Sequence, residues 1–186
     1  MPKNRAFPVE FQVRAGKIPR IVGRIPYNSR SEFMGFFEIL RPGCFTRAIK
    51  KAKKILSLWN HDSSKPLANS ANGSLVLKDS PTALYVEIKP DPTISWAADA
   101  IKAVRRGDLG GLSFGFSLPA DGSGVEYNGD VREITEVDKL FEVSPCVFPS
   151  YSESSVALRN NKTRKRGKKM SKYSLAEIRR ITKEME

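Results

Sequence analysis

The sequence of 186 residues contains a single histidine and two cysteines. Structural zinc sites take four ligands, mostly cysteine and histidine, and Cys44 and Cys146 form no CxxC pair, so we expect no metal. Two cysteines are also too few for a disulfide framework. The simplest expectation is two reduced thiols, as in a cytoplasmic protein.

Long apolar runs are missing as well. No stretch of about 18 consecutive apolar residues occurs, and this excludes a helix that spans a membrane. The first residues, MPKNRAFPVEFQVRAGK, lack the apolar core of a secretory signal. From these two absences we expect a protein of the cytoplasm that has no membrane partner.

Acidic residues are the minority among the charged ones, since 20 Asp and Glu stand against 32 Lys and Arg, for a net charge of +12. The excess is uneven, because residues 159–186 contain 11 Lys and Arg but only 3 Asp and Glu. Residues 1–158 mix both signs, as a solvated surface does. The total charge favours a nucleic-acid partner, but its distribution argues against nucleic acid as the main one.

Apolar and polar residues alternate in several short stretches, as they do in strands with one buried face. Strands are predicted at residues 7–14, 19–26, 35–43, 55–60, 73–79, 83–90 and 110–118, with two more inside 131–145. Apolar residues three and four apart predict helices at 44–54 and 94–106. The fold class is therefore mainly β with flanking helices (α+β), as a closed or strongly bent β-barrel of about seven strands.

The composition changes after Leu158, and this change predicts the domain boundary. Residues 1–158 have the apolar content of one domain, whereas RNNKTRKRGKKMSK shows no apolar periodicity and should be disordered. Ser174 and Glu177 then form a capping-box pattern. We expect a folded domain at 1–158 and, at 159–186, a basic tail with a short terminal helix.

His61, the only histidine, follows a predicted strand in ILSLWNHDSSKPL. Imidazole is the usual proton carrier in catalysis because its ordinary pKa lies near neutrality. Ser113 lies in GDLGGLSFGFSLP, where the glycines would let a substrate carbonyl approach the backbone. A nucleophilic serine needs a base, and His61 is the only imidazole available. From these residues alone, two alternatives remain: His61 could be a structural histidine, and Ser113 could be a serine that only packs within its strand.

A third group would orient the imidazole, and three carboxylates are candidates. Asp62 adjoins His61, but neighbours on a strand project apart, which makes it a poor orienter. Asp138 and Glu142 belong to the last predicted strands. Glu142 lies between Phe141 and Val143, so it either faces inward with a partner or faces solvent. The sequence pattern does not decide between these two placements.

Four successive blocks carry a family resemblance. They are YNSRSEFMGFFEILRPGCF, LSLWNHDSSKPLANSANGSLVLKDSPTALYVEIKP, AVRRGDLGGLSFGF and LFEVSPCVFPSY. In order and approximate spacing, over about residues 20–152, they resemble the signature blocks of the prohead maturation proteases of HK97-like tailed bacteriophages. The resemblance implies a serine endopeptidase with the herpesvirus-assemblin type of fold, a β-barrel surrounded by helices, and no cofactor.

The resemblance also implies roles for single residues. The histidine of the W/L-x-H-D block and the serine of the S-x-GF block are the catalytic pair of that family, and these positions are His61 and Ser113. The herpesvirus enzymes use a second histidine, which this chain lacks. By position in the EVSP block we expect Glu142 in that role, with a hydrogen bond from Ser144 to His61 as the alternative.

Two departures from the family pattern lie outside the implied chemistry. Ala68 stands where relatives commonly have the glycine of a PLG sequence, and Cys146 where they often have a small β-branched residue.

Arg132, in DVREI, is either a surface arginine or a helper of the oxyanion through a water molecule.

The biological role follows from the resemblance. It implies cleavage of the major capsid protein and its scaffolding segment inside the procapsid, in the host cytoplasm, together with self-cleavage, and it suggests a homodimer. The basic tail then either binds an acidic scaffold surface and is cut near 159–172, or merely aids solubility. The competing functions are a non-enzymatic basic protein that binds capsid or nucleic acid, and an inactive homologue that acts as scaffold.

Overall fold

The computed structural model describes residues 3–8, 12–14, 19–31, 33 and 35–147. Within these ranges the chain forms twelve strands and two helices. The strands are β1 Lys3–Pro8, β2 Gln12–Arg14, β3 Arg20–Pro26, β4 Phe37–Leu40, β5 Leu56–Trp59, β6 Asp62–Asn69, β7 Leu75–Asp79, β8 Ala83–Ile88, β9 Gly111–Ser117, β10 Val125–Asn128, β11 Val131–Ile134 and β12 Lys139–Cys146. The helices are α1 Thr46–Lys51 and α2 Ser95–Arg106.

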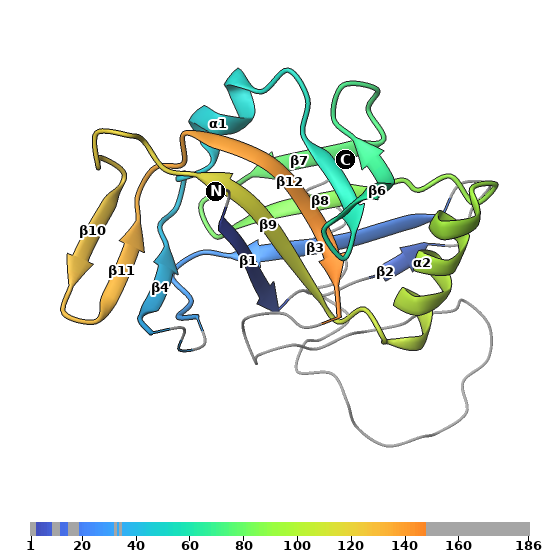
Figure 1. Cartoon of the computed structure of the whole chain (residues 1–186), viewed down its shortest axis with the longest axis horizontal. Coiled ribbons are helices and arrows are strands. Elements are labelled where there is room, and N and C mark those ends of the chain that lie inside the picture. Colours follow the sequence, from blue (N-terminus) through green and yellow to red (C-terminus); the bar gives the residue numbers. More distant parts are fainter. Residues whose placement is uncertain (1–2, 9–11, 15–18, 32, 34, 148–186) are drawn as a thin grey trace.

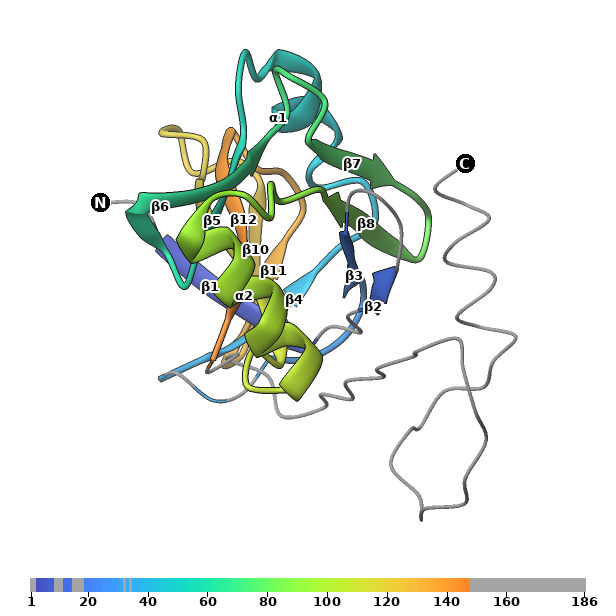
Figure 2. The same cartoon turned by 90° about the vertical axis from the view of Figure 1, so that its right-hand side faces the viewer.

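The strands form three sheets (Figure 1). Five strands, in the order β1-β9-β12-β5-β6, make the largest sheet, and β2-β3-β8-β7 make the second. Figure 2 shows these two sheets on opposite sides of the molecule, with α2 in front. A single cluster of buried apolar side chains draws on both sheets, including Ile25 of β3, Val86 of β8 and Phe114 of β9. The sheets therefore enclose one shared core. The third sheet, β10-β11-β4, lies to one side (Figure 1).

The expected mainly-β class is confirmed, but the expected closed barrel is wrong. Each sheet is open, with edge strands β1 and β6, β2 and β7, and β10 and β4. An alternating pattern specifies that a stretch is a strand and which face is buried, but closure depends on which strands pair and with what stagger. Those pairings are long-range, so the sequence pattern did not contain them.

The described residues contain twelve strands, whereas nine stretches were predicted as strands, because the stretch 7–14 corresponds to two strands and two polar strands were missed. The first half of β6 is exposed at Ser63 to Pro66, and β10 is exposed over most of its length. Neither strand shows the apolar alternation on which the prediction depended. Both form through backbone pairing with a neighbour, β6 with β5 and β10 with β11.

Most of the other predicted elements are confirmed with shifted ends. The helix predicted at 44–54 is shorter, at Thr46–Lys51. The helix predicted at 94–106 is Ser95–Arg106, and Gly107 ends it with a left-handed φ of 83°. The strand predicted at 7–14 corresponds to β1 and β2, and residues 9–11 lie outside the described residues. The tail and terminal helix predicted for 159–186 also lie outside them.

The pairing of β9 with β12 gives the large sheet two chemically different faces. Leu112 and Phe114 of β9 and Val143 of β12 belong to the apolar core. Side chains alternate along a strand, so Ser113 and Ser144 project from the other face. Ser113 pairs with Ser144, and Gly115 pairs with Glu142. The face away from the core therefore carries the polar groups that were singled out from the sequence.

No helix in the described ranges has both the length and the apolar composition that a membrane crossing requires.

Candidate active site

His61 occupies the tight turn that joins β5 to β6. Trp59 pairs with Asp62, so Asn60 and His61 are the two turn residues. Their φ angles of 52° and 65° are both left-handed, as a type I′ hairpin turn requires. Asparagine tolerates this conformation, but for most other side chains it costs about 1–3 kcal/mol. The turn is held beside β12 by a 3.0 Å hydrogen bond from the Asn60 N–H to the Pro145 carbonyl.

The imidazole of His61 contacts the carboxylate of Glu142. Nδ1 of His61 lies 2.8 Å from Oε1 of Glu142, and the two side chains are 25% and 10% exposed. An ionised carboxylate only accepts hydrogen bonds, so Nδ1 carries the proton of this bond. In the neutral imidazole, Nε2 is then the free acceptor, which is the tautomer that a general base needs.

The second oxygen of the Glu142 carboxylate binds Ser144. The Ser144 hydroxyl donates to Oε2, and its oxygen accepts a 2.9 Å hydrogen bond from the backbone N–H of Leu58. Ser144 is fully buried. Both carboxylate oxygens thus have partners, one from the turn after β5 and one from β12 itself. The Ser144 hydroxyl therefore donates its hydrogen bond to Glu142. The alternative expectation was a hydrogen bond from Ser144 to His61.

Ser113 lies on β9, directly opposite Ser144 in the antiparallel register. Residues opposite each other project to the same side, with Cβ atoms about 4.5–5.5 Å apart. Gly115, opposite Glu142, adds no side chain between the strands. Three adjacent strands therefore bring four groups to one face of the sheet, namely Ser113, Ser144, Glu142 and, from the turn that follows β5, His61. Ser113 is 1% exposed, whereas the His61 side chain is 25% exposed, so the site is buried at the serine and reaches the surface at the imidazole.

The other two candidate carboxylates point elsewhere. Asp62 accepts hydrogen bonds from Ser64 and pairs with Lys65. These contacts, the Ser64 hydroxyl first, lower the pKa of Asp62 to about 2. Asp138 lines a groove between α1 and the start of β12. Within the described part of the chain, Glu142 is the carboxylate that meets the imidazole.

Arg132 is not a surface arginine, which was one of the two expectations for it. It is 4% exposed, and its guanidinium pairs with Glu38, whose side chain is fully buried. The guanidinium also lies 4.7 Å from the centre of the Phe36 ring. This pair joins β11 to β4 in the smaller sheet, where Arg132 and Glu38 are register partners. These contacts give Arg132 a structural role in the smaller sheet.

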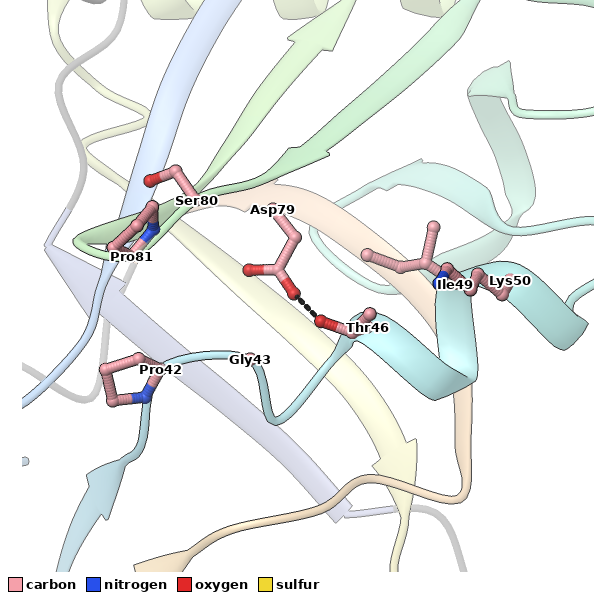
Figure 3. A pocket seen from close by; sticks show the side chains of 8 residues that line it. All are labelled: Pro42, Gly43, Thr46, Ile49, Lys50, Asp79, Ser80 and Pro81. Atoms are coloured by element: carbon pink, nitrogen blue, oxygen red, sulfur yellow. Dashed lines mark hydrogen bonds between the residues drawn. The ribbon is translucent and has the colours of Figure 1, made fainter.

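A separate cavity of about 580 Å³ lies between α1 and the turn from β7 to β8 (Figure 3). Asp79 on its wall accepts 2.5 Å hydrogen bonds from Thr46 and from the Tyr27 hydroxyl. Burial, followed by the bond to Asp79, raises the pKa of Tyr27. These contacts tie α1 to β7 and explain the cluster without a ligand. The described residues contain no group of three His, Cys, Asp or Glu side chains placed to hold a metal.

Comparison with family models identifies one family for this chain. The family model described as caudovirus prohead serine protease matches residues 22–169. The prohead protease of Enterobacteria phage HK97 is 28% identical over 121 residues, which are 64% of this chain and 52% of that protein. The chain thus spans about half the length of this curated relative. The solved structure of the bacteriophage T4 capsid assembly protease covers 79% of this chain and 99% of its own, at 14% identity and a TM-score of 0.44.

Proposed function

The chain belongs to the family of caudovirus prohead serine proteases, and on that premise we propose that it is a serine endopeptidase in which Ser113 is the nucleophile, His61 the general base and Glu142 the group that orients His61. The observation that carries the proposal is the 2.8 Å contact between His61 and Glu142 on the strand that pairs with β9. The contact holds the imidazole against β12, the strand that pairs with the Ser113-bearing strand β9.

The proposed reaction follows the general chemistry of a serine nucleophile. Nε2 of His61 takes the Ser113 proton while Oγ forms a bond to the scissile carbonyl carbon. The tetrahedral intermediate collapses as the imidazolium gives that proton to the leaving amine, and the peptide bond breaks. Water then attacks the acyl-enzyme, with His61 first as base and then as acid, and releases the carboxylic acid and free Ser113.

Glu142 would stabilise the imidazolium that forms in each half of the cycle. Its carboxylate accepts the Nδ1–H hydrogen bond and would compensate the positive charge on His61 in a largely buried place. Ser113 is 1% exposed, so the labelling experiment below also tests whether a reagent reaches Oγ.

The proposed substrates are the major capsid protein and its scaffolding segment, with self-cleavage in addition. The HK97 relative is named a prohead protease and the T4 structure a capsid assembly protease. The place of action would be the procapsid within the host cell. From the resemblance we also infer a homodimer. The change in composition after Leu158 supports a catalytic unit at residues 1–158 and a basic segment at 159–186 that either binds an acidic scaffold surface or aids solubility.

Labelling with a fluorophosphonate tests the proposed chemistry. The reagent bonds covalently to an activated serine, and peptide mapping should locate it on Ser113. Ser113→Ala should abolish labelling and should leave co-expressed capsid protein uncut. Ser57→Ala is the matched control, because Ser57 is an equally buried serine on β5 with no hydroxyl partner among the described residues. If the wild-type protein is folded but is not labelled and does not cut capsid protein, the chain is instead an inactive homologue.

A further inference from the structure

We propose that Ser144 is a positioning residue, which fixes the Glu142 carboxylate and the turn that bears His61 relative to each other. This inference rests on the proposed function, since it concerns the same group of residues. Its basis is the pair of hydrogen bonds that one fully buried hydroxyl makes, to the Glu142 carboxylate and to the Leu58 amide.

The hydroxyl first restricts the carboxylate. A glutamate side chain has several rotatable bonds, and its terminal torsion is broad, so the carboxylate of an unrestrained Glu142 would rotate. Gly115, the cross-strand neighbour of Glu142, has no side chain to pack against it. Ser144 is two residues along β12 and projects to the same side. By donating to Oε2 it leaves Oε1 turned to Nδ1 of His61.

The same hydroxyl also joins the strand of Glu142 to the strand that leads to His61. β12 and β5 run parallel, and their ladder contains a single register pair, Glu142 with Leu56. Beyond that pair the Leu58 N–H bonds to the Ser144 hydroxyl instead of a backbone carbonyl. The Asn60 N–H then bonds to Pro145. Ser144 thus replaces a missing ladder bond just before the turn.

The proton count restricts the groups to which Ser144 can donate. A serine hydroxyl has one proton to donate. The Ser144 proton goes to Glu142 and its oxygen accepts from Leu58, so Ser144 has no proton left for His61 or for Ser113. As a donor, Ser144 therefore acts on Glu142 alone, and this supports an effect on the reaction through the placement of Glu142 and His61.

A double-mutant cycle on the labelling rate tests the inference in the full-length protein. Ser144→Ala should slow fluorophosphonate labelling of Ser113 by between about tenfold and 100-fold, because a shift of about 1 Å in a catalytic group has that effect. In a Glu142→Gln background the same change should slow labelling by a smaller factor, since the part of the effect that passes through the Glu142 carboxylate is already lost. Ser57→Ala, the buried-serine control, should leave the rate unchanged.

An NMR measurement supplies a readout that a general loss of stability would not move. His61 is the only histidine, so its imidazole signals need no further assignment. The wild type should show a downfield Nδ1–H signal protected from exchange, and Ser144→Ala should lose it at temperatures where circular dichroism shows a folded protein. If Ser144→Ala does not fold, Ser144→Cys replaces it, because a thiol of similar shape is a weak donor.

The outcomes separate the two proposals. A wild-type labelling rate together with a retained Nδ1–H signal in the Ser144 variant would overturn the positioning role and leave the proposed function intact. The positioning role would also be overturned if Ser144→Ala slowed labelling by the same factor in the wild-type and the Glu142→Gln backgrounds. Undiminished labelling of Ser113→Ala would refute the proposed function itself, whatever the Ser144 variants show.

Discussion

Nδ1 of His61 lies 2.8 Å from Oε1 of Glu142, although 81 positions separate the two residues in the sequence. One comes from a two-residue turn and the other from the strand beside it. Substitution of single residues can therefore test the turn, the carboxylate and the nearby buried serines one at a time.

Replacing His61 by glycine should separate catalysis from folding. Glycine adopts the φ of 65° at this turn position without strain, which offsets the lost bond to Glu142. We expect the free energy of unfolding, measured by urea titration, to change by less than about 1 kcal/mol. The labelling rate of Ser113 should fall at least about 100-fold, because general-base catalysis is lost.

Asn60→Gly is the matched control for His61→Gly, since it changes the neighbouring residue of the same turn and keeps the imidazole. It should label at nearly the wild-type rate. A loss in Asn60→Gly as large as in His61→Gly would assign the effect to the turn and not to the base.

Glu142→Gln tests which carboxylate orients the imidazole. The amide keeps the shape of the side chain but removes the charge that compensates the imidazolium, so labelling should slow at least about tenfold. Asp138→Asn is the comparison, because Asp138 lies in the groove beside α1. It should have no effect, and a larger loss in Asp138→Asn than in Glu142→Gln would reverse the assignment.

Ser57→Ala should stabilise the protein. The Ser57 hydroxyl is fully buried and has no hydrogen-bond partner among the described residues. An unsatisfied buried hydroxyl costs about 1–3 kcal/mol, so removing it should raise the free energy of unfolding by about 1 kcal/mol. Urea or thermal unfolding measures this, and a destabilised variant would show that the hydroxyl has a partner after all.

Arg132→Met should destabilise the protein by about 3–5 kcal/mol, because it leaves the buried Glu38 carboxylate without its counter-charge. The double variant Arg132→Met with Glu38→Leu should recover most of this loss. Among molecules that remain folded, the labelling rate of Ser113 should match the wild type. A rate loss of 100-fold in folded Arg132→Met would instead place the guanidinium in the chemistry.

The two thiols should be inert in the folded protein. Burial, followed by the nearby Glu142 carboxylate, raises the pKa of Cys146 to about 12, and burial raises the pKa of Cys44 as well. At pH 8 iodoacetamide should alkylate neither thiol until urea unfolds the chain. Above the ordinary thiol pKa of about 8.5 the unfolded state binds fewer protons, so these two groups make stability fall as pH rises. Rapid alkylation of the native protein would contradict their burial.

The sequence alone identified most of the elements and the residues of interest. Periodicity located α2 and its end at Gly107, and the four blocks singled out His61, Ser113 and Glu142. It did not show that Ser144 binds Glu142 or that Arg132 is buried with Glu38. The Arg132–Glu38 contact joins two different strands, and the Ser144–Glu142 contact depends on the rotamers of two side chains on one strand. A local sequence pattern specifies neither the pairing of strands nor the rotamers.

By itself, the sequence determined which segments have a face to bury, that the chain is mainly β, and which family it belongs to. These depend on residue type and spacing, which are local. Only the tertiary structure decided that the sheets stay open, and that the turn after β5 meets β12 with its imidazole on a carboxylate. Strand order and register arise from pairings between distant segments that compete in free energy, and they exist only once the chain has folded.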